Sequence, residues 1–391
     1  MQGWKMTLGL SGVALGAALV APRLFPILGE APPEPVPVAE VEADPDPLPE
    51  PAPAPEPRNV DIVIALDTSG SMNKLIDSTR ARLWDIINEV DRQDPDATLR
   101  VGLITFGSPR YGVQNDYVKI QVPLTEDLDT VYEVALGIRT GGGEEYVGAT
   151  IDHALRGMDW SPEDNSDNRR ILFVAGNESA MLGPVGFNPA ARQAVAAGVI
   201  VNTLFAGEEV DGVRLGWDQV ANLGGGQFLA IDTARSAVAV STPYDRKLAT
   251  LNAQLNSTYI SYNQEGAAKI QQIRANDRAA AAMGAGNLAS RAATKSSKKH
   301  RVASWDLIAG VESGTIDLDA IDDTKLPAEM QNLEKDQLQA RLLEAEASRI
   351  AAKRAINEIQ QQRVEYLAEQ VQPDEAAGLD QAIAEVLASQ L

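Results

Sequence analysis

The sequence contains no cysteine and only two histidines, His153 and His300, among its 391 residues. The absence of cysteine excludes disulfide bonds, thiolate metal sites, cysteine lipidation and cysteine nucleophiles. With two histidines in the whole chain, sites that need two or three clustered imidazoles are also disfavoured. Basic residues are few as well: 34 Lys and Arg stand against 55 Asp and Glu, which gives a formal net charge of −21. This balance argues against nucleic-acid binding through a phosphate-neutralising surface.

Residues 30–57 form the most biased segment of the chain. They hold eight carboxylates, no basic residue and eleven prolines. Such a segment cannot bury enough apolar surface to fold, and its charges repel one another. We expect an extended, partly polyproline-II spacer, comparable to a stalk.

An apolar run of sixteen residues, 6–21, precedes this stalk. The run is long for the core of a signal peptide and short for a membrane span of about 20 residues. Residues 1–29 are therefore predicted to be either a cleaved signal peptide or a retained N-terminal membrane anchor, and a buried core helix is the third alternative. The first two place the rest of the chain outside the cytoplasm, in the periplasm or at the cell surface.

From residue 58 the sequence alternates short apolar runs with helical patterns. Strands are predicted at residues 60–66, 99–106, 118–122 (an edge strand), 170–175, 199–205 and 227–230. Helices are predicted between them, at residues 74–90, 128–138, 147–158, 189–197 and 216–223. This alternation is typical of an α/β fold with a doubly wound, mostly parallel, Rossmann-like sheet, assigned here to residues 58–245. Ligands of such sheets bind at the carboxyl ends of the strands.

The remaining residues are predicted to be mostly helical. Residues 246–328 are Ala-rich, and residues 329–391 contain a long helix with a heptad-like seam. The seam could form a weak coiled coil and mediate self-association, or it could belong to a helix lying on the domain. Its members are Leu338, Leu342, Ala345, Arg349, Ala352, Ile356, Ile359, Arg363 and Tyr366.

Candidate metal ligands follow the first predicted strand, in the sequence Asp67-Thr68-Ser69-Gly70-Ser71. One carboxylate and two hydroxyls at alternating positions offer hard oxygen ligands to Mg²⁺ or Mn²⁺. Alternatively, a serine could cap the next helix while Asp67 accepts from backbone amides. A glycine-rich loop, residues 140–145, follows a later helix and is expected nearby.

These loops resemble those of the von Willebrand factor A (integrin I-like) domain family, over about residues 58–244. The resemblance implies a metal-ion-dependent adhesion site, with Asp67, Ser69 and Ser71 as ligands and a partner's carboxylate completing the coordination. It also suggests an exported bacterial subgroup of the family. Two positions depart from the family pattern: Glu144 stands where the family has Thr, and Gly176 stands where it has Asp.

The two departures predict a metal site that is retained but altered. Glu144 adds one carboxylate and Gly176 removes one, so the formal ligand charge is kept while its position moves. Asn177 is a further possible ligand, or it holds the loop turn. The alternative is a degenerate site that keeps the fold and has lost the ion.

The sequence thus predicts an exported, membrane-tethered module for divalent-cation-dependent protein binding or adhesion, without catalysis. The expected partner is a protein that presents a carboxylate, and nucleic acid is not expected. Two alternatives remain: a scaffold assembled through the C-terminal helices, or an accessory subunit of an AAA+ ATPase system. Catalysis is not expected because Asp152 and His153, adjacent on one helix, point about 100° apart and cannot complete a triad with Ser71.

Overall fold

The computed structural model describes residues 58–163, 165, 167–231, 241–370 and 379–391. The predicted signal or anchor (1–29) and the acidic stalk (30–57) lie outside these residues. Within the described part of the chain, no helix combines the length and the apolar character that a membrane crossing requires.

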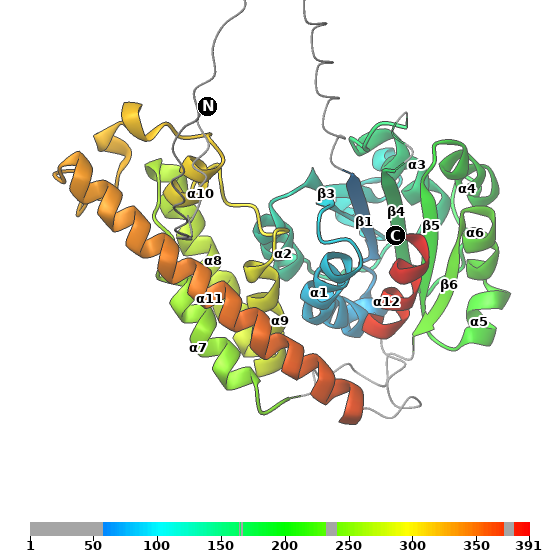
Figure 1. The fold of residues 1–391 in the computed structure, drawn as a ribbon. Coiled ribbons are helices and arrows are strands. Elements are labelled where there is room, and N and C mark those ends of the chain that lie inside the picture. Colours follow the sequence, from blue (N-terminus) through cyan, green and yellow to red (C-terminus); the bar gives the residue numbers. More distant parts are fainter. Residues whose placement is uncertain (1–57, 164, 166, 232–240, 371–378) are drawn as a thin grey trace, which may run out of the picture. The chain divides into compact units, whose positions relative to one another are not determined.

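A six-stranded sheet forms the centre of the α/β body (Figure 1). Its strand order is β3-β2-β1-β4-β5-β6, and all neighbours are parallel except the antiparallel pair β2 and β3. This confirms the predicted doubly wound, mostly parallel sheet and the edge position of the third strand. The strands are β1 (Asn59–Asp67), β2 (Thr98–Phe106), β3 (Val118–Thr125), β4 (Arg169–Gly176), β5 (Ile200–Ala206) and β6 (Gly225–Ile231).

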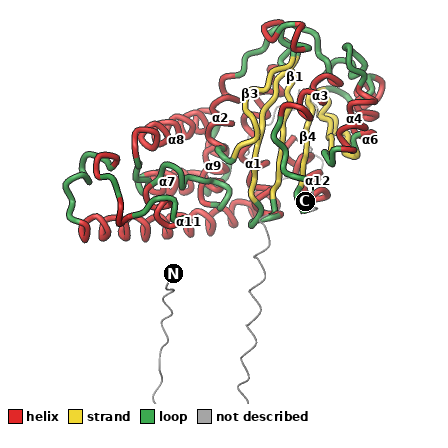
Figure 2. The backbone as a smooth tube through the Cα atoms, turned by 90° about the horizontal axis from the view of Figure 1, so that it is seen from above, coloured by secondary structure: helices red, strands yellow, loops and turns green. Residues whose placement is uncertain are grey.

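Helices cover both faces of this sheet, because side chains of a buried parallel strand are apolar on both sides. One face packs against α1 (Asn73–Gln93), α2 (Leu128–Gly137) and α12 (Leu379–Gln390). The other face packs against α3 (Val147–Gly157), α4 (Phe187–Ala196) and α6 (Trp217–Leu223), while the short α5 (Glu209–Arg214) follows β5. Figure 2 shows the strands between these two helical layers.

The last helix of the chain completes the core of the α/β body. In α12, Ile383, Val386 and Leu387 are buried in the same hydrophobic cluster as β1 and α1. The end of the chain is also tied to the sheet: Arg58 Nη2 donates to the Leu391 carbonyl oxygen at 2.6 Å, and Asn202 Nδ2 donates to Gln390 Oε1 at 3.0 Å. The helices between β6 and α12 are therefore inserted before the final helix of the body.

The inserted helices build their own core beside the sheet (Figure 2). They are α7 (Asp245–Asn256), α8 (Asn263–Met283), α9 (Ala285–Ser296), α10 (Leu307–Glu312) and α11 (Lys335–Gln370). The predicted heptad-like seam of α11 faces this core. Arg349 pairs with Asp306 at 2.6 Å, Arg363 pairs with Asp245 at 3.0 Å, and Ile356 is fully buried. The seam therefore packs against the chain's own helices, and self-association of the chain stays a prediction.

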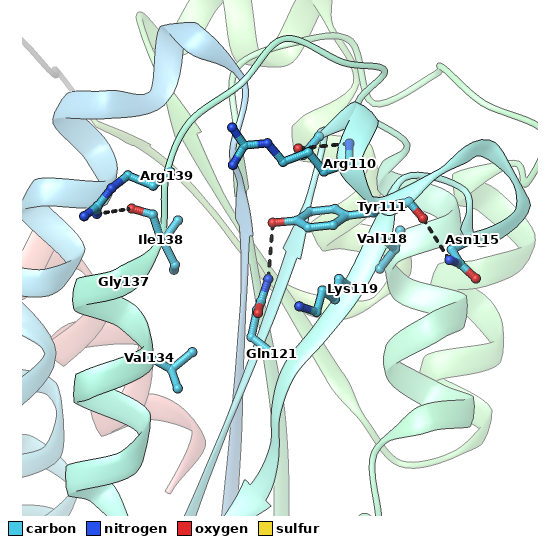
Figure 3. A pocket seen from close by; sticks show the side chains of 11 residues that line it. Arg110, Tyr111, Asn115, Val118, Lys119, Gln121, Val134, Gly137, Ile138 and Arg139 are labelled. Atoms are coloured by element: carbon cyan, nitrogen blue, oxygen red, sulfur yellow. Dashed lines mark hydrogen bonds between the residues drawn. The ribbon is translucent and has the colours of Figure 1, made fainter.

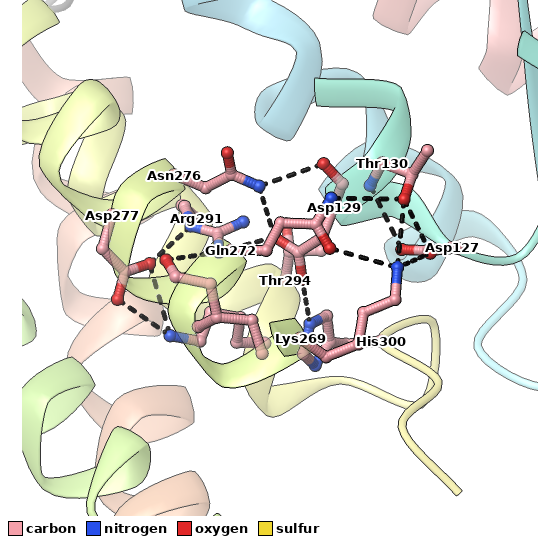
Figure 4. A network of polar contacts seen from close by, with 12 residues as sticks. Asp127, Asp129, Thr130, Lys269, Gln272, Asn276, Asp277, Arg291, Thr294 and His300 are labelled. Carbon is pink, nitrogen blue, oxygen red and sulfur yellow. Dashed lines mark hydrogen bonds and ion pairs between the residues drawn. The ribbon is translucent and has the colours of Figure 1, made fainter. Parts of the chain in front are cut away.

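A buried network of charges holds the inserted helices against the α/β body (Figure 4). Arg291 of α9 donates to Asp129 of α2 at 2.7 Å and to Asp277 of α8 at 2.5 Å, and its guanidinium lies 4.6 Å from the Trp84 ring centroid. His300 Nε2 lies 2.9 Å from the other Asp129 oxygen. Although burial would raise the pKa of Asp129, the charge of Arg291 and the bond to His300 hold it well below its usual value.

Candidate metal site

The carboxyl end of β1 brings the three predicted first-loop residues together. Asp67 is fully buried; its Oδ1 accepts from the Ser69 amide at 2.6 Å, and its Oδ2 accepts from the Ser69 hydroxyl at 3.1 Å. The hydroxyl oxygens of Ser69 and Ser71 lie 2.9 Å apart. A short 3₁₀ turn, Gly70–Met72, leads from this loop into α1. One carboxylate and two hydroxyls therefore converge, as the motif predicted.

Asn177, directly after β4, joins this group. The Ser71 hydroxyl donates to Asn177 Oδ1 at 3.1 Å. Because β1 and β4 are parallel neighbours, their carboxyl ends meet at one edge of the sheet. Asn177 thus presents its carbonyl oxygen to the β1 loop.

The glycine-rich loop supplies Glu145 to the site, and not Glu144. Glu145 is only 8% exposed, and its side chain bonds to Ser69, whereas Glu144 is exposed. The side chain of the predicted ligand Glu144 therefore does not face Asp67, and Glu145 takes that place.

Two contacts of the loop backbone explain this orientation. Gly141 N donates to the Thr68 carbonyl oxygen at 2.8 Å, which ties the start of the loop to the end of β1. Farther along, a Cβ on Gly143 would lie 2.3 Å from the Gly107 carbonyl oxygen, so only glycine permits this close approach. With both points fixed and α3 beginning at Val147, the residue turned inward is Glu145.

Gly107 makes room for the two carboxyl groups. It follows β2 with a φ of +78°, which favours glycine. A Cβ at this position would lie 2.8 Å from Asp67 Oδ1 and 2.9 Å from Glu145 Cγ. The two acidic side chains therefore flank the same glycine, a relation that the sequence pattern alone did not indicate.

Both carboxyl groups hold their protons more tightly than usual. Burial raises the pKa of Asp67 to about 7, against the lowering effect of the Ser69 amide and hydroxyl. Burial, together with the negative charges of Asp67 and Glu178, raises the pKa of Glu145 to about 8. Among the described residues, no lysine or arginine forms an ion pair with Asp67 or Glu145, and the main causes of the two pKa shifts are burial and neighbouring acidic groups.

This donor set fits a hard divalent cation. Carboxylates that repel one another and lack a basic partner are stabilised by a bound cation, and Mg²⁺ or Mn²⁺ takes carboxylate, hydroxyl and carbonyl oxygens. Among the described residues, no group of three or more His, Cys, Asp or Glu side chains is arranged to bind a metal ion. An ion here would therefore depend on the two serines and on oxygens from outside the chain.

The sequence model of the family named von Willebrand factor type A domain matches residues 61–215. These residues form a von Willebrand factor type A domain. The match begins in β1 and ends just after α5, so β6 and α12 extend the sheet and the core beyond the matched range. A domain of this family implies a protein-interaction or adhesion module.

Solved structures of low sequence identity resemble this type A domain. The conserved hypothetical protein BatB from Bacteroides thetaiotaomicron is 19% identical over 46% of this chain and 93% of its own, with a TM-score of 0.36. An aerotolerance-related membrane protein from Bacteroides fragilis is 20% identical over 46% and 94%, with a TM-score of 0.33. Proximal thread matrix protein 1 from the mussel byssus, described with a zinc-occupied MIDAS motif, is 13% identical over 46% and 43%, with a TM-score of 0.36. No curated protein matches the chain.

Trp217 occupies the space beside Gly176 in this type A domain. A Cβ on Gly176 would lie 2.8 Å from Trp217 Cη2 and 3.4 Å from the Asp67 Cβ. The indole is fully buried, and its Nε1 donates to the Glu178 carbonyl oxygen at 2.7 Å. An aspartate at position 176 would thus collide with the indole ring, which holds the loop after β4 in place.

Proposed function

We propose that the type A domain binds Mg²⁺ or Mn²⁺ through Asp67, Ser69, Ser71 and Glu145, and uses the ion to bind a carboxylate of a protein partner. The pairing of Asp67 with Glu145 around Gly107 is the observation that carries this proposal. Bound at this edge of the sheet, a divalent cation would supply positive charge that attracts an anionic ligand.

The residues of the site have distinct roles in this proposal. Asp67 and Glu145 supply negative charge from two loops, and the serine hydroxyls supply neutral oxygens held 2.9 Å apart. Asn177 orients Ser71 through its 3.1 Å hydrogen bond. Glu178, which lies close enough to raise both pKa values, adds to the negative potential that attracts the ion.

The proposed activity is binding without catalysis. His153 pairs with Asp116 at 3.3 Å, and Asp152 pairs with Arg156 at 2.7 Å. These partners support the view that neither side chain serves Ser71 as a catalytic base or orienting group.

Export from the cytoplasm, with tethering through the N-terminal segment, is part of the same proposal. Its support is the apolar run at residues 6–21 followed by the acidic segment 30–57. We expect an alkaline phosphatase fused at residue 61 to be active and a cytoplasmic reporter fused there to be silent. The reverse pattern would exclude export.

Calorimetric titration of the full chain with Mn²⁺ tests the metal site. We expect millimolar or tighter binding, and Glu145→Gln should weaken it at least about tenfold, which is about 1.4 kcal/mol. Glu144→Gln is the matched control, since it removes the same charge from the neighbouring exposed position, and should change the affinity less than about twofold.

Two results would overturn the proposal. If the unaltered chain binds no Mn²⁺, the site is degenerate and the scaffold alternative, with the type A domain as a structural element, is favoured. If Glu144→Gln weakens binding as much as Glu145→Gln, the loss reflects general charge and not coordination.

A further inference from the structure

Three cationic side chains line one open cavity of about 690 Å³ beside the metal site (Figure 3). Arg110 comes from the segment after β2, Lys119 from the edge strand β3, and Arg139 from the segment after α2. We call this cavity the basic pocket. Such a concentration of positive charge is unexpected in a chain with a net charge of −21.

No carboxylate neutralises these three cations within the described residues. None of them forms an ion pair there, and the Arg139 guanidinium donates only to carbonyl oxygens, of Leu136 at 3.4 Å and Ile138 at 3.2 Å. Some exposed arginines elsewhere do pair with acidic neighbours, as Arg354 does with Glu358 at 2.9 Å. The basic pocket therefore offers positive charge to a ligand from outside.

The basic pocket adjoins the metal site through Ser108. Ser108 lines the pocket and directly follows Gly107, the glycine flanked by Asp67 and Glu145. The Ser108 hydroxyl also lies near Gly141, at 3.7 Å from the place a Cβ would take. A ligand that reaches the metal site can therefore extend into the pocket within a few residues.

The rest of the lining suits a polypeptide. The Tyr111 hydroxyl is held by Gln121 at 3.2 Å and by Thr105 at 2.9 Å, which leaves a fixed polar wall. Val118, Val134 and Ile138 add apolar surface. Strand β3 is the edge of the sheet, where extended peptides commonly lie. A long polyanion such as nucleic acid would instead be repelled by the acidic remainder of the chain.

We propose that the basic pocket binds acidic side chains of a partner polypeptide, next to the carboxylate that the metal site would take. The type A domain then recognises an acidic segment and not a single carboxylate. The choice of a carboxylate-bearing protein as the partner rests on the proposed metal-dependent binding. The contribution of the pocket itself is electrostatic and does not require the metal.

Fluorescence anisotropy with a labelled glutamate-rich peptide tests the proposal on the full chain. The matched probe has glutamine at every glutamate position. The pocket variant is Arg110→Glu with Lys119→Glu. The control variant is Arg341→Glu with Arg354→Glu, which makes the same change in net charge at exposed positions of α11.

The pocket variant should lose at least about tenfold in affinity for the glutamate peptide, while the control variant should lose less than about twofold. The loss should persist in EDTA, weaken at high salt and be absent with the glutamine peptide. Circular dichroism and thermal melting show whether both variants remain folded.

The outcomes separate this inference from the proposed function. If Mn²⁺ does not bind but the glutamate peptide still needs Arg110 and Lys119, the pocket stands and the metal-dependent function falls. If Mn²⁺ raises peptide affinity but the pocket variant matches the control variant, the pocket inference falls. Tighter binding of a thymidine oligonucleotide than of the peptide would also overturn it.

Discussion

Replacing Asp67 with asparagine should stabilise the metal-free protein. The buried carboxyl has a pKa of about 7 in the folded chain, against 3.8 as its ordinary value. Since the folded state holds the proton more tightly than the unfolded state, this group favours folding below about pH 4. That contribution is lost as the pH rises through about 7.

The size of the effect follows from the difference between the two pKa values. A pKa difference of one corresponds to about 1.4 kcal/mol, so ionising Asp67 in the folded protein costs up to about 4 kcal/mol. Asparagine has nearly the same shape, carries no charge and can still accept from the Ser69 amide. We therefore expect Asp67→Asn to raise the unfolding free energy at pH 8 in EDTA by about 1 to 4 kcal/mol.

Urea unfolding in EDTA at pH 6 and pH 8, followed by tryptophan fluorescence, measures this change. Trp84 and Trp217 are buried in the α/β body and report its unfolding. The gain should be larger at pH 8, and Glu144→Gln, at an exposed position, should give none. Adding Mn²⁺ at a hundred times its dissociation constant should stabilise only the unaltered chain, by about 2.7 kcal/mol, and so reduce the advantage of Asp67→Asn by that amount. If Asp67→Asn is no more stable than the unaltered chain at pH 8, the burial and the mutual repulsion of these carboxylates are misjudged.

Four further predictions concern the packing around the site, the core of the α/β body and the buried charge network. Gly176→Asp should lower the unfolding free energy by about 2 kcal/mol or more, because its Cβ would lie 2.8 Å from Trp217; an unchanged melting temperature would contradict this. Leu387→Ala should lower the unfolding free energy by about 2 to 5 kcal/mol if α12 belongs to the core. Leu343→Ala, at a position that is 57% exposed, should leave the unfolding midpoint in urea almost unchanged. Arg291→Met should lower the unfolding free energy by about 3 to 5 kcal/mol, because it leaves the buried Asp129 and Asp277 without their arginine partner. An unchanged unfolding free energy would show that the network is dispensable. Burial would raise the pKa of Asp277, but the charges of Lys295 and Arg291 lower this pKa to about 2. The unfolding free energy of the unaltered chain should therefore fall between about pH 4 and pH 2, and it should fall less steeply in Arg291→Met.

Local sequence determined the elements of the sheet and the first loop of the site. The apolar runs that predicted strands at residues 60–66 and 170–175 are observed as Asn59–Asp67 and Arg169–Gly176. A buried parallel strand needs apolar side chains on both faces, so its position is visible in the residues themselves. Asp67, Ser69 and Ser71 could also be predicted from local sequence, because all three lie at or just after the end of a recognisable strand.

Only the tertiary structure decided which glutamate of the second loop enters the site. The loop from Thr140 to Glu145 has no regular secondary structure, so no periodicity tells which side chain points inward. The answer depends on the close approach of Gly143 to Gly107, two residues on different loops that meet through the order of the strands. Contacts of this kind have no signature in either segment alone.

The positions of the C-terminal helices were likewise determined only by the tertiary structure. The amphipathic patterns predicted a long helix and a short one, observed as α11 and α12, but they could not identify what those apolar faces contact. Packing of α12 against β1 and α1, and of α11 against the inserted helices, joins residues separated by up to hundreds of positions. An apolar stripe reports only that a face is buried; the partner is chosen by the shape and charge of the assembled surfaces, as the pairing of Arg291 with Asp129 illustrates.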